Sequence, residues 1–314
     1  METFHSLLAT FYNLKVFLKN CSKDFKEWLS EVTMDTLRLQ KKYKVIVPEY
    51  KRCLIYLVGC GGTGSFIAQN LARLDYFLRR SGRLIETCFI DPDQVREENV
   101  GRQNFCPQDI GKPKSKILSE RYNFAYGSKS SYSTLSFKDL QFERNFPYDT
   151  NLRIIIGAVD TTLSRLSIDT FVRNQGISYW WLDCGNSYSS GQVLLGNSWR
   201  REDRSEMINP LGICKYLPLP SIQHPELIDP NFDSSTPRRS CAQLVDRGEQ
   251  NLFVNQLVAS FVSSFLYHLL VLRELDHYAA YFDFSTCSSK VYPITLENLS
   301  KYITKKLVHA IANN

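Results

Sequence analysis

The chain has 314 residues, 43% of them hydrophobic, so it can bury the core of one large domain or two modest ones without disulfides or metals. Its net charge of +6 is spread along the chain, and no block of like charge is typical of a nucleic-acid-binding tail. The nine cysteines are odd in number, form no C-x-x-C pair and follow no secretory signal. These features argue against a structural zinc site, and we expect a reduced, cytoplasmic location.

The predicted elements begin with an N-terminal helical extension over residues 1–50, made of short amphipathic helices, and a main domain over residues 51–314 follows. In that domain apolar strands alternate with helices, which predicts an α/β fold with a doubly wound, mostly parallel, Rossmann-like sheet. The predicted strands lie at 53–59, 83–91, 152–160, 179–186 and 191–196, and the helices at 63–80, 113–126 and 162–174.

The last third of the chain has a different pattern. Residues 197–248 are rich in Pro, Ser, Asp and Arg and predict a long loop region, which in a compact domain is often functional. A long helix is predicted near 249–275, then a hairpin and a basic helical tail. Residues 251–272 carry no charged side chain, but polar residues interrupt them at several positions, so we interpret this stretch as a core helix and not as a membrane span.

A glycine-rich turn follows the first predicted strand. Gly59, Gly61 and Gly64 have the G-x-G-x-x-G spacing, in which glycines let the backbone approach a phosphate at a helix N-terminus. The turn alone fits NAD, FAD, S-adenosylmethionine or ATP, and it also fits a simple turn with no ligand.

The residues after the second strand narrow this choice. An NAD site needs one acid at the strand end, and Asp91 is in that position. NAD has no need for the closely spaced Arg102, Gln103 and Lys114, whereas a triphosphate needs cations to neutralise its charge. Asp160 ends the third strand, where an acid beside a triphosphate is a natural Mg²⁺ ligand. The pattern favours ATP with Mg²⁺.

Several motifs in fixed order carry a family resemblance. The chain has G-x-G-G-x-G-S at 59–65, D-P-D-Q-V at 91–95, N-x-x-R-Q at 99–103, G-x-x-K at 111–114 and V-D at 159–160. With these motifs the sequence resembles the ThiF/MoeB/ubiquitin-activating-enzyme superfamily over about residues 53–293. Stretches such as "NVGRQNF" and "QNLFVNQ" are most similar to the ThiF-like proteins of the bacterial PRTRC gene cluster.

The resemblance implies acyl adenylation, in which the C-terminal carboxylate of a ubiquitin-like β-grasp protein attacks the α-phosphorus of ATP. It implies a homodimer and a conjugating-enzyme-like protein as a further partner. From the charge pattern and the polar residues within 251–272 we expect no nucleic-acid or membrane partner. The resemblance also implies residue roles: Asp91 would bind the ribose, Asp160 would hold Mg²⁺, Gly61 would allow close approach, and Asn99, Arg102, Gln103 and Lys114 would bind phosphates. Gly59, Gly62 and Gly64 complete the nucleotide-binding turn.

Some of these residues have structural alternatives. Asp93 fits a nucleotide role and a loop cap equally well, Asp160 could cap the next helix, and Arg102 could be a solvated surface cation. Asp109 and Arg165 could have structural roles as partners of other side chains in the protein. Relatives often supply an arginine from the partner subunit, for which Arg38 and Arg52 are candidates that no motif fixes.

A thioester step would need a partly exposed cysteine with a lowered pKa. Cys241 is the predicted nucleophile, because Arg238 and Arg239 would favour its thiolate. Cys184, Cys214 or no cysteine at all remain alternatives. For the whole chain, the alternatives to an activating enzyme are a non-catalytic ATP-binding scaffold of a PRTRC-type complex and an NAD-linked oxidoreductase or a tRNA-modifying dehydratase relative.

Overall fold

The structure is a computed structural model that describes residues 40–140, 150–175, 179–199, 207–209, 211–231 and 252–302. The predicted helices of the N-terminal extension and Cys241 lie outside these residues. The chain divides into two compact units, one formed by Tyr43–Ile294 and the other by Met1–Lys42 with Thr295–Asn314. The predicted domain bounds at 1–50 and 51–314 stay a prediction.

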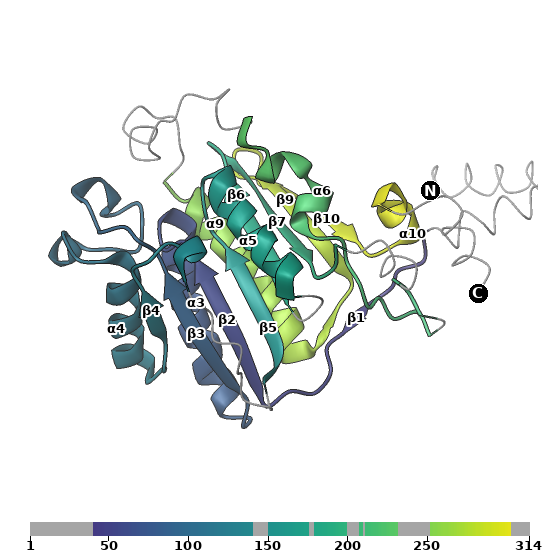
Figure 1. Cartoon of the computed structure of the whole chain (residues 1–314), viewed down its shortest axis with the longest axis horizontal. Coiled ribbons are helices and arrows are strands. Elements are labelled where there is room, and N and C mark those ends of the chain that lie inside the picture. The colour runs from purple at the N-terminus through teal and green to yellow at the C-terminus, as the bar shows by residue number, and fades with distance from the viewer. Residues whose placement is uncertain are drawn as a thin grey trace, which may run out of the picture. The chain divides into compact units, whose positions relative to one another are not determined.

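The larger unit is built on an eight-stranded sheet with the strand order β10-β9-β7-β6-β5-β2-β3-β4 (Figure 1). The strands from β4 to β6 in this order pair in parallel, and β7, β9 and β10 extend the sheet with antiparallel pairs. This confirms the predicted mostly parallel α/β sheet. The strand bounds are Arg52–Val58 for β2, Leu84–Ile90 for β3, Ser131–Ser133 for β4, Thr150–Gly157 for β5, Trp180–Asn186 for β6, Ser190–Gly196 for β7, His277–Asp283 for β9 and Ser288–Pro293 for β10.

Helices cover both faces of this sheet. Figure 1 shows α5 in front of the strands and α9 behind them. The α9 helix packs on α3, β6 and β7, and α3 also contacts α4, while α5 contacts β5 and two short helices, η3 and η5. The bounds are Gly62–Arg79 for α3, Lys114–Tyr126 for α4, Thr162–Gln175 for α5, Pro220–Gln223 for α6 and Val254–Tyr267 for α9. The short helices are η1 (Glu97–Asn99), η2 (Pro107–Asp109), η3 (Phe137–Asp139), η5 (Pro225–Ile228) and the π-helical η6 (His268–Leu272).

Two smaller features complete the description. In the larger unit, β1 (Val45–Ile46) and β8 (Glu274–Leu275) form a separate antiparallel pair. In the smaller unit, α10 (Leu296–Leu299) and η7 (Ser300–Tyr302) form the described part of the predicted helical tail.

The helix over Val254–Leu272 is long and apolar enough to cross a membrane by length and composition. Half of its residues are buried inside the protein, and it packs against α3 and two strands. A core helix passes the same test of length and composition, and these contacts support that interpretation.

The strand order reverses its direction at one point of the sheet. From β2 the chain moves through β3 to β4 on one side, and then crosses to β5 on the other side of β2. Ligands of open α/β sheets bind beyond the carboxyl ends of the strands at such a reversal. The glycine turn follows β2 and Asp160 follows β5, so the fold places both predicted motifs at this edge.

Candidate functional site

Two of the four glycines are required by the packing of the turn itself. Gly59 has a φ of +90°, and a Cβ on it would lie 2.4 Å from the carbonyl oxygen of Ala158. A Cβ on Gly64 would lie 1.9 Å from the carbonyl oxygen of Gly59. The Gly59 N–H donates to Ile90 O at 2.9 Å. The turn is therefore held against the ends of both β3 and β5.

The other two glycines, Gly61 and Gly62, have no side chain that could cover the start of α3. Gly61 precedes α3 and makes no side-chain cap, and the nearest atom to a Cβ there would be Gln103 Nε2 at 3.9 Å. A Cβ on Gly62 would lie 2.6 Å from Asn255 Oδ1, so Gly62 allows α9 to approach α3 closely. The first turn of α3 also contains no acidic residue. Its N–H groups and the positive end of the helix dipole suit an anion.

The acids after β3 bind the backbone and a buried lysine. Asp91 Oδ2 accepts the Cys60 N–H at 2.6 Å and Asp91 Oδ1 accepts the Asp93 N–H at 2.8 Å. Burial raises the pKa of Asp91, while Lys114 and these two N–H donors act against the increase. Lys114, the first residue of α4, donates to Asp93 Oδ2 at 2.9 Å. Asp91 therefore anchors the glycine turn to β3, and its predicted ribose contact stays a prediction.

The loop after β3 supplies buried polar atoms without protein partners. Asn99 Oδ1 accepts the Arg96 N–H, and Asn104 N–H donates to Ser65 Oγ, which ties the loop to α3. Arg102 and Gln103 are each only 6% exposed. Among the described residues, neither Arg102 Nε nor Gln103 Oε1 has a hydrogen-bond partner. Leaving such atoms unpaired is costly, so they indicate a ligand, and Arg102 is not the solvated cation of the alternative interpretation.

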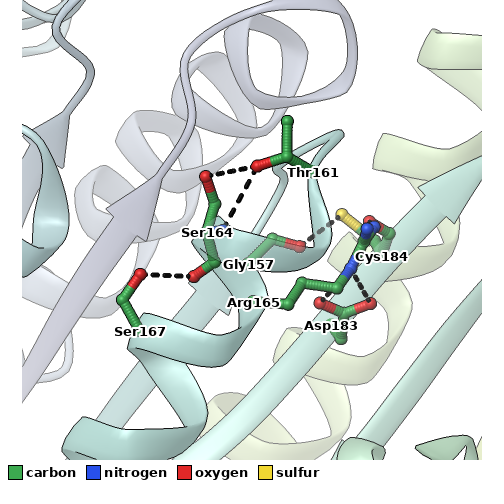
Figure 2. A network of polar contacts seen from close by, with 7 residues as sticks. All are labelled: Gly157, Thr161, Ser164, Arg165, Ser167, Asp183 and Cys184. Carbon is green, nitrogen blue, oxygen red and sulfur yellow. Dashed lines mark hydrogen bonds and ion pairs between the residues drawn. The ribbon is translucent and has the colours of Figure 1, made fainter. Parts of the chain in front are cut away.

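Asp160 is exposed just beyond the end of β5 and, among the described residues, makes no hydrogen bond or ion pair. The cap of α5 is instead Thr161, whose Oγ1 accepts the Ser164 N–H at 3.2 Å (Figure 2). This removes the alternative in which Asp160 caps that helix, and leaves its carboxylate available to a cation.

A buried ion pair between Arg165 of α5 and Asp183 of β6 holds α5 against the sheet (Figure 2). Arg165 Nε lies 3.1 and 3.2 Å from the two carboxylate oxygens of Asp183, and Arg165 Nη2 donates to Cys184 O. The Cys184 thiol in turn donates to Gly157 O at the end of β5. Burial raises the pKa of Asp183 to about 6, against the effect of Arg165. Arg165 is thus a structural partner, as the sequence allowed.

Asp109 is also structural. Its Oδ2 accepts from Arg121 and from the Cys106 N–H. Arg52 pairs with Glu86 at the amino end of β2, the end opposite the glycine turn, and Arg38 lies outside the described residues.

The cysteine candidates differ in their surroundings. Cys184 and Cys214 are buried, and burial raises the pKa of both thiols, that of Cys214 to about 12. Neither has the exposed, acidic thiol that nucleophilic catalysis needs. Cys241, Arg238 and Arg239 lie outside the described residues, so the role of Cys241 stays a prediction.

Sequence reasoning missed Asn255 as a site residue. It is the second residue of the apolar α9 helix and accepts a hydrogen bond from Thr63 at the start of α3, 192 positions earlier in the sequence. The only local signal was a polar residue at the start of an apolar helix, which is common in helices of any kind.

Comparison with known proteins identifies the family. Residues 48–294 match the ThiF family, and the chain belongs to it. A 72-residue segment, 23% of this chain and 22% of the relative, is 33% identical to the NEDD8-activating enzyme E1 catalytic subunit of Saccharomyces cerevisiae. The solved structure of E. coli MccB with ATP is similar in fold, with a TM-score of 0.52 and 14% identity over 84% of this chain and 66% of MccB. The chain thus spans less than two thirds of both proteins.

The residues present fit a magnesium nucleotide. The glycine turn offers N–H groups at the start of α3, Arg102 and Lys114 supply buried positive charge, and Asp160 supplies a carboxylate. Phosphates need the first two features, and Mg²⁺ prefers carboxylate and phosphate oxygens.

Proposed function

We propose that this chain is an ATP-dependent adenylating enzyme. The observation that carries the proposal is the buried, unpartnered Arg102 Nε in the loop beside a glycine turn, at the reversal point of the sheet. A buried guanidinium nitrogen without a partner among the described residues is explained by an anionic ligand that binds there. Membership of the ThiF family supports adenylation as the chemistry.

The proposed roles follow from the positions of the residues. The glycine turn of Gly59, Gly61, Gly62 and Gly64 accommodates the phosphates, and Arg102 and Lys114 neutralise them, with Asn99 and Gln103 as further contacts. Asp91 would bind the ribose, with Asp93 as a further nucleotide contact. Asp160 would hold Mg²⁺, which would neutralise charge on the phosphate oxygens.

In the reaction, an oxygen of the acyl substrate's carboxylate bonds to the α-phosphorus and the bond from that phosphorus to the bridging oxygen breaks. Pyrophosphate leaves with the bonding electrons, and the mixed anhydride that remains is a good acyl donor. The protein contributes orientation and charge neutralisation to bring two anions together.

For the acyl substrate we propose the C-terminal carboxylate of a ubiquitin-like β-grasp protein. Family membership and the segment shared with the NEDD8-activating subunit support this choice. The further proposals are transfer to Cys241 as a thioester, a conjugating-enzyme-like partner, a homodimer, a PRTRC-type system and a cytoplasmic location.

The first test is calorimetric titration of the full chain with MgATP and with NAD⁺. ATP binding without NAD⁺ binding supports the proposal, and the reverse would favour an oxidoreductase. The second test is ATP–pyrophosphate exchange with a β-grasp protein encoded by the same genome, using wild type, Asp160→Asn and Cys241→Ala.

We expect exchange that is lost in Asp160→Asn and kept in Cys241→Ala, because the cysteine acts after adenylation. Asp229→Asn is the matched control, since Asp229 is an exposed carboxylate that follows η5. ATP binding without exchange for any carboxylate substrate would instead favour an ATP-binding scaffold.

A further inference from the structure

Asn255 is a buried amide with half of its hydrogen-bonding capacity unused. It lies in the first turn of α9 and is only 3% exposed. Among the described residues, Asn255 Nδ2 is buried and has no hydrogen-bond partner. A buried NH₂ group without an acceptor costs free energy, and its retention calls for an explanation.

The orientation of the amide is set by two donors. Thr63 Oγ1 donates to Asn255 Oδ1 at 3.1 Å, and Asn186 Nδ2 donates to the same oxygen at 3.1 Å. Thr63 belongs to α3 and Asn186 ends β6, so the Asn255 oxygen connects α9 to two other elements. The NH₂ group is therefore the half of the side chain that is left for another molecule.

The NH₂ group lies beside the first residue of α3. A Cβ on Gly62 would be 2.9 Å from Asn255 Nδ2, and Cβ bonds of a helix tilt toward its N-terminus. The donor is thus close to the N–H groups of a helix start that has neither a side-chain cap nor an acidic residue. A second donor at this position strengthens a site for an anion.

We propose that Asn255 Nδ2 donates a hydrogen bond to a phosphate oxygen of the nucleotide bound at the start of α3. This inference rests on the proposed function, because it needs the phosphates at the glycine turn. Asn255 is then a ligand-binding residue supplied by α9, and Thr63 and Asn186 are the residues that hold its amide in place.

The test measures the affinity of the full-length chain for ATP by calorimetry and for adenosine by saturation-transfer NMR. Asn255→Ala removes the donor, and we expect it to weaken ATP binding by about 10-fold, as for the loss of a hydrogen bond to a charged group. Asn255→Asp keeps the oxygen that Thr63 and Asn186 need and places a carboxylate where the donor was. We expect a larger loss of ATP affinity for this variant, and unchanged adenosine binding for both variants.

Asn197→Ala is the matched control. Asn197 is also a buried asparagine, but its side chain already donates to Lys215 O and accepts the Leu217 N–H. ATP affinity of the Asn255 variants equal to that of wild type would overturn the inference, and so would an equal loss of ATP and adenosine binding, which indicates a structural role. If Asn255→Ala fails to fold, the ATP and adenosine affinities of Asn255→Asp alone test the inference. A wild-type chain that binds no ATP would overturn the proposed function itself, and this inference with it.

Discussion

Gly64→Ala is expected to destabilise the free protein through a backbone clash. The new Cβ would lie 1.9 Å from the carbonyl oxygen and 2.8 Å from the carbonyl carbon of Gly59. Ordinary contact begins near 3.4 Å, so the turn would have to move by about 1.5 Å (3.4 − 1.9). Gly59 cannot easily yield, because it is packed against the Ala158 carbonyl and its N–H is bonded to Ile90 O. We expect a loss of about 3 kcal/mol in the free energy of unfolding.

Gly61→Ala provides the comparison. The nearest atom to its new Cβ is 3.9 Å away, but its backbone (φ −81°, ψ −132°) lies outside the regions that alanine favours, so we expect a loss of about 1–2 kcal/mol, smaller than for Gly64→Ala. Urea unfolding followed by tryptophan fluorescence, without nucleotide, measures both values. Equal stabilities of the two variants, or a greater loss in Gly61→Ala, would refute the packing argument. In ATP titrations Gly61→Ala should bind at least 10-fold more weakly, because its methyl group covers the open side of the turn.

Three further results are expected. Arg102→Ala should reduce ATP affinity at least 10-fold without lowering the thermal midpoint of unfolding, because Arg102 Nε is buried and unpaired in the free protein. A lower midpoint with unchanged ATP affinity would contradict the proposed role of Arg102. Asp183→Ala should lower the free energy of unfolding by about 3–5 kcal/mol, because it leaves the Arg165 cation buried without its partner. A change below about 1 kcal/mol in urea titrations would contradict a stabilising role of the Arg165–Asp183 ion pair. At pH 8 iodoacetamide should alkylate exposed Cys106 and leave Cys214 unmodified. Burial raises the pKa of Cys214 to about 12, so its thiolate forms only in more alkaline solution. Equal labelling of the two cysteines by mass spectrometry would contradict this prediction.

The sequence predicted the main strands and helices because their signals are local. The apolar run at 53–59 became β2, and the helix predicted at 63–80 became α3 within one residue at each end. β4 was missed, because its sequence Ser-Tyr-Ser at 131–133 has no apolar pattern and becomes a strand only by pairing with β3. The predicted strand at 152–160 ends at Gly157 in the structure, and the three residues that follow form the loop that carries Asp160.

The candidate site was predictable where motifs lie next to strand ends. Asp91 and Asp160 were expected at the carboxyl edge of a parallel sheet, and the strand order places both there. The sequence could not show that the Asp91 carboxylate is occupied by the Cys60 and Asp93 N–H groups. Such contacts depend on the conformation of the turn and not on residue type alone.

By itself, the sequence determined the α/β alternation, the glycine turn and the order of charged residues that follows it, since strand and helix periods and turn chemistry act over a few neighbouring residues. Only the tertiary structure decided which polar groups remain unpaired. Arg165 pairs with Asp183 and is therefore not free to bind a ligand. Arg102 Nε, in contrast, has no hydrogen-bond partner among the described residues. Asn255 approaches Thr63 from 192 residues away because α9 packs on α3, and burial then makes its free NH₂ group costly. Packing between distant segments, which no local pattern encodes, therefore selects the groups that a ligand can bind.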